Sequence, residues 1–192
     1  MKIISALSVL GAFVGASVDR SALYDYYKGI NKDELIWAVN CGSEKPLIDK
    51  DGVEWQADSN YEGGIKSSEG NNHRWIVPNA DIYHSERWSK SAKFSYFLPV
   101  YNEGHYTLVL KFSEIYFDEP GEKVFNVYMG DSILLHNLDP VESAGSKMLP
   151  HDEFLEFEIR IVSGQKKVYF GGNEMRNVFD KTNRIKLEFR KG

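Results

Sequence analysis

The 192-residue sequence contains a single cysteine, Cys41, and no Asn-x-Ser/Thr sequon. One cysteine cannot form a disulfide within the chain, so the fold has to be stable without a covalent cross-link. We expect Cys41 to be buried, as unpaired cysteines commonly are. The missing sequon predicts that the protein carries no N-linked glycan of its own.

Runs of basic residues are also absent. The chain has 23 Lys and Arg against 28 Asp and Glu, which gives a formal net charge of −5. A mildly acidic surface without a basic cluster argues against nucleic acid and against an anionic membrane as partners.

The common signatures of catalysis and cofactor binding are missing as well. The chain has no G-x-S-x-G, no G-x-x-x-x-G-K-[ST] and no H-E-x-x-H, and its five histidines do not follow metal-ligand spacing. A single cysteine excludes a cysteine-based zinc site. Asp49 and Asp51 begin like a calcium loop, but further ligands do not follow, so we interpret them as a solvated turn. We therefore expect no cofactor, no metal and no enzymatic activity.

A glycosidase is the enzymatic alternative, because such enzymes need only a pair of carboxylates. The candidates are common acidic residues and include Glu86, Glu114, Asp139 and Asp152.

The first residues read as a targeting signal. Lys2 supplies a positive start, residues 3–14 form a short apolar run, and Val14-Gly15-Ala16 is a small-residue cleavage site. We predict a signal peptide over residues 1–16 and a protein of the ER lumen or of the secreted fraction. A membrane anchor would need about 20 apolar residues, and no later stretch is apolar enough to span a bilayer. Cleavage removes one Lys and no acid, so the net charge becomes 22 − 28 = −6.

Residues 17–34 are polar and rich in Tyr, and we interpret them as a linker or a short helix. Residues 35–40 show little alternation, which predicts a strand buried on both faces. Asp51-Gly52 is a hairpin signal. Residues 56–80 hold much Gly, Ser and Asn, which is typical of a long loop with a binding role.

Apolar and polar residues alternate in three later segments, residues 106–113, 155–161 and 184–190. A period of two with one apolar face predicts half-buried strands. Several such strands without helical patterns between them indicate an all-β fold, an antiparallel β-sandwich with few and short helices. Trp37, Trp55 and Trp75 are expected to be core residues or loop anchors.

Three segments carry a resemblance to a known family. They are LIWAVNCG at residues 35–42, IYHSERW at 82–88, and FSEIYF at 112–117 with KVFNV at 123–127. In this order and spacing they resemble the motifs of the malectin family. NLD at 137–139 and HDE at 151–153 also fall where that family has similar residues. The resemblance covers residues 35–192.

The resemblance implies a lectin-like, jelly-roll-like β-sandwich. Animal members of the family are found in the ER and bind diglucosylated high-mannose N-glycans. We therefore expect a carbohydrate-binding domain of the secretory pathway that recognises glucose-containing or high-mannose N-glycans in glycoprotein quality control. The alternative is a domain that keeps the fold but binds a protein, with an ER or membrane protein as the partner.

The resemblance also implies site residues. Tyr116 and Phe117 match the family's aromatic pair, and Trp88 takes a third aromatic position. The family has a further Tyr in the long loop, and Tyr61 is the nearest candidate here. In one alignment, residues 185–192 resemble the strand before the family's Asp, so that this Asp and the last strand are missing here. In the other, Asp180 is that Asp and residues 184–189 are the last strand.

Physical chemistry supports the same kind of site. A sugar ring has an apolar face that packs on an aromatic ring, and a rim of hydroxyl groups that pairs with carboxylates such as Glu86. Tyr116 and Phe117 are adjacent, so in a strand they would point to opposite faces. Both can serve one site only if the strand ends before them, and residues 118–121, with Pro120 and Gly121, supply a loop there.

Overall fold

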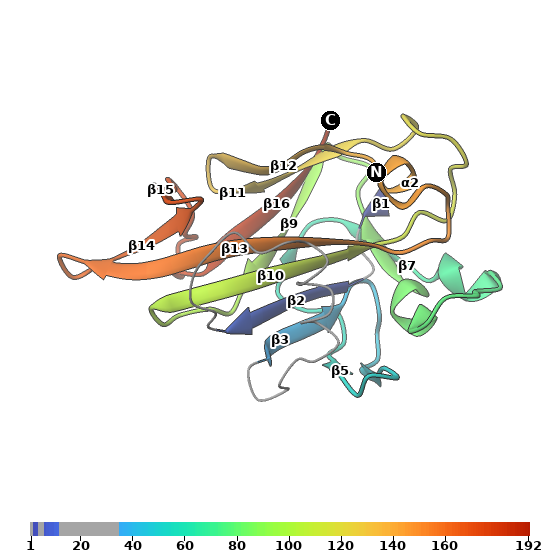
Figure 1. The fold of residues 1–192 in the computed structure, drawn as a ribbon, viewed down its shortest axis with the longest axis horizontal. Helices are drawn as coiled ribbons and strands as arrows, with labels where there is room; N and C mark the ends of the chain where they lie inside the picture. The colour runs from blue at the N-terminus through green and yellow to red at the C-terminus, as the bar shows by residue number, and fades with distance from the viewer. Residues whose placement is uncertain (1, 4–5, 12–34) are drawn as a thin grey trace.

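The computed structural model describes residues 2–3, 6–11 and 35–192 as two antiparallel sheets packed face to face (Figure 1). The predicted all-β sandwich with few short helices is confirmed. The six-stranded sheet has the order β15 (Asn173–Glu174), β14 (Gln165–Phe170), β13 (His151–Val162), β10 (Gly104–Phe112), β2 (Ala6–Gly11), β3 (Leu35–Asn40). The five-stranded sheet has the order β12 (Ser132–Leu138), β11 (Phe125–Met129), β16 (Ile185–Lys191), β9 (Lys93–Leu98), β6 (Tyr61–Glu62).

Smaller elements surround the sandwich. β8 (Glu86–Trp88) lies between β1 (Lys2–Ile3) and β7 (Ile65–Ser67), and β4 (Leu47–Ile48) pairs with β5 (Glu54–Trp55). The described helical elements are the α-helix α2 (Pro140–Ala144) and the 3-10 turns η2 (Glu69–Asn72) and η3 (Ala80–Tyr83).

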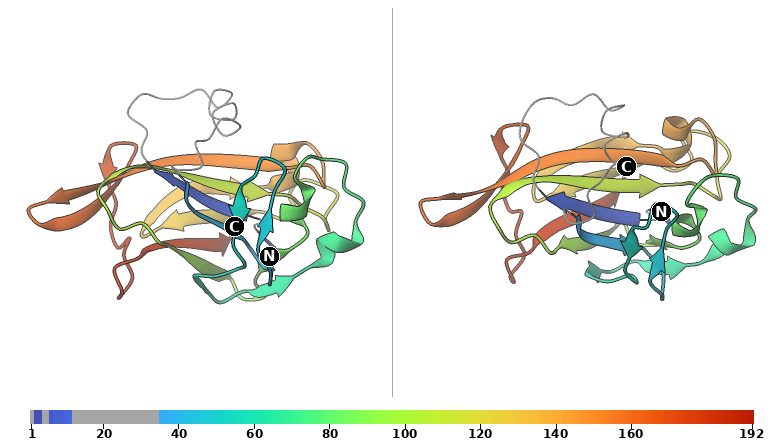
Figure 2. Two further views of the ribbon diagram at one scale, coloured as in Figure 1. Left: turned by 90° about the horizontal axis from the view of Figure 1, so that it is seen from below. Right: turned by 60° about the horizontal axis from the view of Figure 1, so that its bottom comes forward.

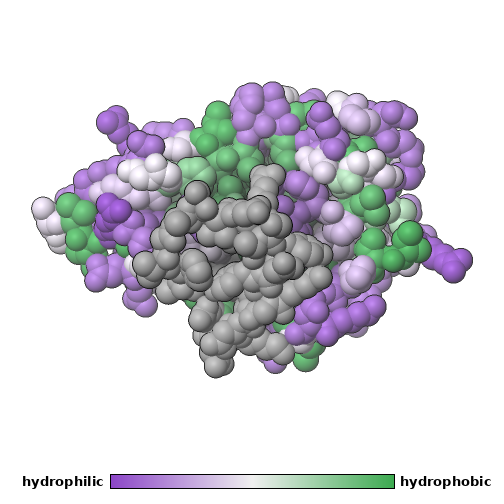
Figure 3. All heavy atoms as spheres, viewed as in Figure 1, coloured by the Kyte–Doolittle hydropathy of each residue, from purple (hydrophilic) through white to green (hydrophobic). Residues whose placement is uncertain are grey.

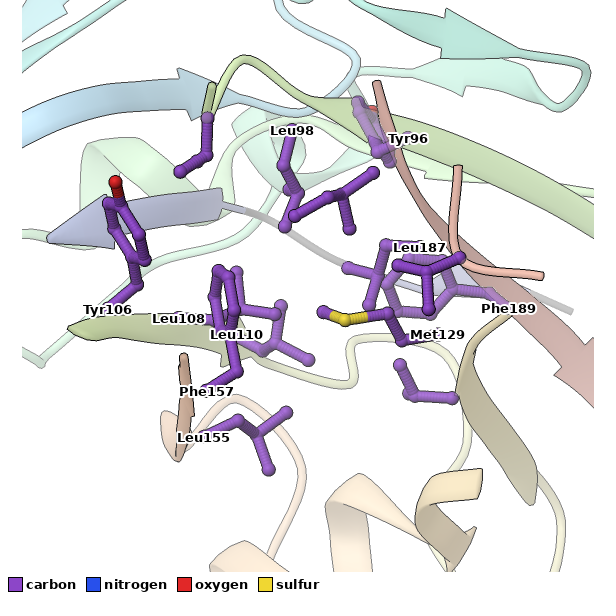
Figure 4. Packing of buried hydrophobic residues seen from close by; sticks show 14 of the residues in the cluster. Tyr96, Leu98, Tyr106, Leu108, Leu110, Met129, Leu155, Phe157, Leu187 and Phe189 are labelled. Atoms are coloured by element: carbon purple, nitrogen blue, oxygen red, sulfur yellow. The ribbon is translucent and has the colours of Figure 1, made fainter. Parts of the chain in front are cut away.

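The core fills the space between the two sheets. The three segments with the predicted alternation form β10, β13 and β16, and most of their apolar residues are buried against one another (Figure 4). Two details of the prediction were wrong: Ile161 near the end of β13 is 57 % exposed, and β10 is buried on both faces rather than on one. Aromatic rings stack between neighbouring strands of each sheet, with ring centroids 5.3 Å apart for Tyr106 and Phe157 and 5.1 Å apart for Phe94 and Phe189. Offset stacking adds to the free energy gained by burying their area.

The predicted burial of β3 on both faces is confirmed from Trp37 to Asn40, whereas Ile36 near its start is 44 % exposed. Trp37 and Val39 belong to the main core, whereas Ala38 between them packs in a second apolar cluster with Trp55 and Tyr83. The second cluster lies beneath the β4–β5 hairpin and η3. Cys41, which follows β3, is fully buried and free, as expected.

The hairpin signal at residues 51–52 is also confirmed. Leu47 pairs with Trp55 across the turn, and the Asp49 carboxylate organises it. That carboxylate accepts hydrogen bonds from the amides of Asp51 and Val53, both at 2.9 Å, and from Trp55 Nε1 at 2.8 Å. Asp49 is thus a turn residue.

The segment predicted as a loop over residues 56–80 contains the short strands β6 and β7 and the turn η2. Strands of two and three residues are too short to show a period, so the pattern could not reveal them. The expected linker over residues 17–34 lies outside the described residues.

The expected signal peptide overlaps β1 and β2. β2 is an interior strand of the six-stranded sheet, with β10 on one side and β3 on the other. In the described part of the chain, no helix is long and apolar enough to cross a membrane.

The two ends of the sandwich carry different loops. The segment that follows β10 gathers with α2, β7 and η2 at one end, while β14, β15 and the segment before β16 lie at the other (Figures 1 and 2). Hydrophilic residues cover most of the visible surface outside the grey segment, and hydrophobic residues form scattered patches (Figure 3). A binding site therefore has to be sought in local geometry.

Candidate functional site

The loop that follows β10 is shaped by one buried carboxylate. Glu114 Oε1 accepts hydrogen bonds from three successive amides, those of Ile115 at 2.9 Å, Tyr116 at 2.7 Å and Phe117 at 3.3 Å. The other oxygen, Oε2, forms an ion pair with Lys123, and both side chains are almost fully buried. The negative charge of Glu114 is therefore neutralised inside the protein. β10 ends at Phe112, so Tyr116 and Phe117 lie in a loop and can both contact one ligand.

A second carboxylate fixes the far side of the same loop. Asp139 is buried and accepts a hydrogen bond from the amide of Gly121. Its other oxygen accepts from the amides of Val141 at 2.9 Å and Glu142 at 3.2 Å, which makes Asp139 the N-cap of α2. The loop is held at both ends, which keeps the conformational cost of presenting Tyr116 and Phe117 to a ligand low.

The first two motifs of the sequence meet behind this loop. Ser85 Oγ donates to Asn40 Oδ1 at 3.1 Å between two buried side chains. Gly42 lies against the backbone of Glu86, so closely that a Cβ at Gly42 would be 2.0 Å from the Glu86 carbonyl oxygen. Gly42 also has φ of +80°, a conformation that glycine tolerates best. The close approach joins the end of β3 to the start of β8.

A groove of about 520 Å³ opens at this junction. Its walls are the segment after β3 and the β7–η2 segment, with η3 at one side. Most of the lining residues carry a hydroxyl, amide or charged group, among them Asn40, Ser43, Lys66, Ser67, Asn71 and His84.

Two pairs of ionisable side chains lie at the groove, Lys66 with Glu44 and His84 with Asp81. Lys66 forms an ion pair with Glu44, and its hydrogen bond lowers the pKa of the Glu44 carboxyl below its ordinary value. His84 Nδ1 lies 3.7 Å from an Asp81 carboxylate oxygen. Such a lining offers both donors and acceptors, which suits a ligand with many hydroxyl groups.

Tyr116 joins the aromatic loop to the groove. Its hydroxyl lies 3.3 Å from Ser67 Oγ, and Ser67 is part of the groove lining. Ser67 is also the register partner of Glu86 across the β7–β8 pair. Tyr116 and Glu86 are 30 residues apart in the sequence, yet both are neighbours of Ser67 in the structure.

Phe117 adjoins Tyr116 in the loop, whereas Trp88 lies further along β8 and does not line the groove. Phe117 is next to Tyr116 and 37 % exposed, so its ring is accessible to a ligand. Trp88 is half-buried in β8, two residues after Glu86 and in register with Ile65. Residues two apart in a strand share a face, so Trp88 and Glu86 lie on the same side of β8.

Tyr61 occupies a different environment. Its ring stacks on the Arg87 guanidinium, whose carbon is 3.3 Å from the ring centroid. Arg87 points to the opposite face of β8 from Glu86 and forms a buried ion pair with Asp58 at 2.6 Å. Asp58 in turn accepts a hydrogen bond from the Tyr96 hydroxyl at 2.8 Å. Tyr61 belongs to this structural cluster, and the structure does not bring it to the groove.

Asp180 lies at the far end of the sandwich. It belongs to the turn before β16, which begins at Ile185 opposite Leu98 and ends at Lys191 opposite Phe125. β16 spans six residue steps of about 3.3 Å, or roughly 20 Å, and the loop that carries Tyr116 is at the Phe125 end.

The Asp180 carboxylate is also engaged locally. Desolvation alone would raise the pKa of Asp180, but hydrogen bonds from Arg184 and Thr182 lower it to about 2. Asp180 forms an ion pair with Arg184 at 2.9 Å. It stabilises its own turn and is not brought together with Tyr116.

Several groove residues were not singled out from the sequence. Ser67, Ser68 and Asn71 fall within the segment predicted to be a binding loop, so their region was indicated but not their roles. Asn40 and Ser85 lie inside the first two motifs. Their pairing across 45 positions depends on the tertiary fold.

Metal ligands do not gather around the groove. Within residues 2–3, 6–11 and 35–192, no cluster of three or more His, Cys, Asp or Glu side chains could hold a metal ion. The chemistry available at the site is therefore that of hydrogen bonds, ion pairs and aromatic contacts from the side chains named above.

The β-sandwich and its loop with Tyr116 and Phe117 are features that the sequence resemblance implies. Comparison with protein families agrees, because the family model described as "Malectin domain" matches residues 35–192. The chain is 34 % identical over 133 residues to Malectin-A of Xenopus laevis and to Malectin of Homo sapiens. The chain belongs to the malectin family.

The matched stretch covers 67 % of this chain but 47 % of the Xenopus protein and 44 % of the human protein. The chain thus spans less than half the length of these relatives.

Solved structures show the same fold. The ANX2 ectodomain from Arabidopsis thaliana superposes with a TM-score of 0.61 at 17 % identity, covering 79 % of this chain and 43 % of that one. The ANXUR1 extracellular domain from the same plant gives a TM-score of 0.60 at 18 % identity, covering 96 % and 48 %. At this identity the likeness concerns the fold alone.

Proposed function

We propose that the groove and the adjoining aromatic loop bind an oligosaccharide without transforming it, and that the ligand is a glucose-containing or high-mannose N-glycan. The contact between Tyr116 and Ser67 carries the proposal, because it places an aromatic ring at the edge of a groove lined with hydrogen-bonding groups. The ring offers a surface for the apolar face of a sugar, and the groove offers partners for its hydroxyl groups.

Four of the six predicted site residues have a role in the proposal that follows from their position. Tyr116 and exposed Phe117 contact the sugar ring, and Trp88 extends the aromatic surface along β8. Glu86 supports the groove wall at Ser67. Tyr61 and Asp180 are left out of the contact surface, because they lie in the Arg87 cluster and at the opposite end of the sandwich.

The proposal includes a location. Residues 1–16 have the pattern of a signal peptide, so the protein enters the secretory pathway and meets N-glycans in the ER lumen or after secretion. Sequencing of the N-terminus of the exported protein should find Ser17 first. Full-length protein retained in the cytosol with Met1 would contradict export.

The test of binding combines a glycan array with titrations of the strongest glycan. Tyr116→Ala should weaken binding by about 2 kcal/mol, roughly 30-fold, the typical loss for a hot-spot residue. Tyr101→Ala is the matched control, because Tyr101 is 52 % exposed and lies beside Lys166 of β14, at the other end of the sandwich. The control should bind like the parent.

Thermal melts of both variants complete the test. Tyr116 is half-buried, and Glu114 holds the backbone of its loop, so truncation of Tyr116 should leave the protein folded. Binding that is unchanged in a folded Tyr116→Ala variant would place the site elsewhere, and a parent that binds no glycan on the array would contradict the proposed function.

A further inference from the structure

The strand β2 of the six-stranded sheet lies within the predicted signal peptide. β2 pairs with β10 from Ala6–Lys111 to Gly11–Tyr106, and with β3 from Ala6–Asn40 to Leu10–Leu35. β2 is antiparallel to both neighbours, so β10 and β3 run parallel to each other, with β2 between them (Figures 1 and 2). The occupant comes from the segment that we propose is removed on export.

The residues of β10 and β3 that flank β2 at two register levels belong to the main core. At one register level Val9 pairs with Leu108 and Trp37, and at another Leu7 pairs with Leu110 and Val39. The four partners on β10 and β3 are at most 4 % exposed and all belong to the core between the sheets. Residues at one register level share a face of a sheet, so a strand in this position needs an apolar residue at each of the two levels.

Loss of β2 would leave two facing sheet edges. Strands in a sheet are about 4.8 Å apart, so β10 and β3 would be separated by about 9.6 Å. Their backbone amides and carbonyls would lose hydrogen-bond partners along five or six residues, and buried apolar side chains would be exposed. Closing the gap would shift β3, which is fixed by packing on both faces.

We propose that the position between β10 and β3 is a strand-binding site, and that after removal of residues 1–16 it binds an extended segment of a protein partner. The partner segment is about six residues long, as β2 is, runs antiparallel to both neighbours and is apolar at the two levels named above. Addition of a strand to a sheet is an established mode of peptide recognition. The proposal rests on export but is independent of carbohydrate binding, and it provides a place for a protein partner.

The experiment uses the whole chain with a specific protease site inserted after Arg20. The purified protein is cut, and a fluorescent peptide with the sequence of residues 2–14 is added. Binding is followed by anisotropy, and the complex is counted by native mass spectrometry. Two variant peptides carry the same added charge, Val9→Asp within β2 and Ser5→Asp one position before β2 begins.

If the site binds a strand, the labelled peptide replaces the cut fragment with a one-to-one stoichiometry and raises the melting temperature of protein freed of that fragment. Val9→Asp should weaken binding at least about tenfold, because its charge would meet the core level of Leu108 and Trp37. Ser5→Asp should bind within about twofold of the parent peptide, because it replaces one polar residue with another and leaves all residues of β2 unchanged.

Two results would overturn the proposal. In one, the cut fragment leaves and the remaining chain stays folded and monomeric, with an unchanged melting temperature and no peptide binding. In the other, Val9→Asp and Ser5→Asp bind equally well. A glycan titration of the same cut protein, made in parallel, reports on the proposed function separately.

Discussion

The loop after β10 and the rim of the groove are neighbours, yet they use charge in opposite ways. In the loop, Glu114 and Lys123 are buried and satisfy each other and the backbone. At the rim, Glu44 and Lys66 have side chains that are 72 % and 56 % exposed and pair in water. Buried charge fixes the shape of the backbone, whereas exposed charge remains available to a ligand. The contrast predicts which substitutions affect folding and which affect only binding.

Removal of the buried charge should have the largest effect. Glu114→Ala leaves Lys123 unpaired and three amides without an acceptor, so the free energy of unfolding should fall by about 3–5 kcal/mol. Chemical denaturation measures the change. Glu119→Ala, in the exposed part of the same loop, should leave the denaturation midpoint where it is. Equal midpoints for the two variants would mean that Glu114 does not hold the loop.

The close approach behind the groove gives the next effect. Gly42→Ala should destabilise the protein by more than the roughly 1–2 kcal/mol that a positive φ costs a residue other than glycine, because the new methyl group would collide with the Glu86 carbonyl. Gly145→Ala is a matched control, since Gly145 has φ of +84° but nothing within 4 Å of its Cβ position. A similar loss of stability in both variants would show that the contact with Glu86 adds nothing to the cost of the positive φ.

These two sites show what the sequence could and could not predict. Alternation predicted β10, β13 and β16, because a period of two depends only on local residues. Glu114 was noticed only as one of several carboxylates that could serve a glycosidase, and the structure shows it bonded to three amides and Lys123. Its role depends on a partner nine positions away whose burial no local pattern reports.

The same limit applies to the site. Tyr61 was chosen for its proximity in the sequence, but β6 pairs with β9 and places it on Arg87. The distance between Asp180 and Tyr116 follows from the register of β16, and this is a property of the whole sheet. The groove requires Asn40 and Ser85 to meet, which only tertiary packing decides.

The third test concerns the buried Cys41 thiol and the dependence of stability on pH. Burial, and next the charge of Asp58, raise the pKa of the Cys41 thiol well above its ordinary value. The unfolded thiol then ionises first, so this contribution to stability is complete below the ordinary thiol pKa of about 8.5 and is lost as pH rises beyond it.

The melting temperature should therefore fall above about pH 8.5, and Cys41→Ala should make the fall smaller in that range. Burial also raises the pKa of Tyr96, whose contribution is lost only at higher pH. Native Cys41 should react with a thiol reagent only after unfolding. Rapid labelling of the folded protein would show that the thiol is accessible.

The rim should give the smallest effect on stability. Lys66→Ala removes an ion pair between exposed side chains, and such pairs contribute little because water and salt screen them. The melting temperature should stay the same at low and at high salt. A drop comparable to that of Glu114→Ala would show that the rim is part of the structural framework and would remove the distinction between the two regions.

The contact at Gly42 also limits how a site of this kind can diversify. Where two backbone segments touch with only a hydrogen atom in place of a side chain, no residue type remains to be exchanged at that point. The base of the groove is therefore fixed in width, and a new ligand preference has to arise from the residues around its opening, such as Glu44, Lys66 and Asn71. Selection experiments for altered specificity should accumulate substitutions at these positions and leave Gly42 unchanged.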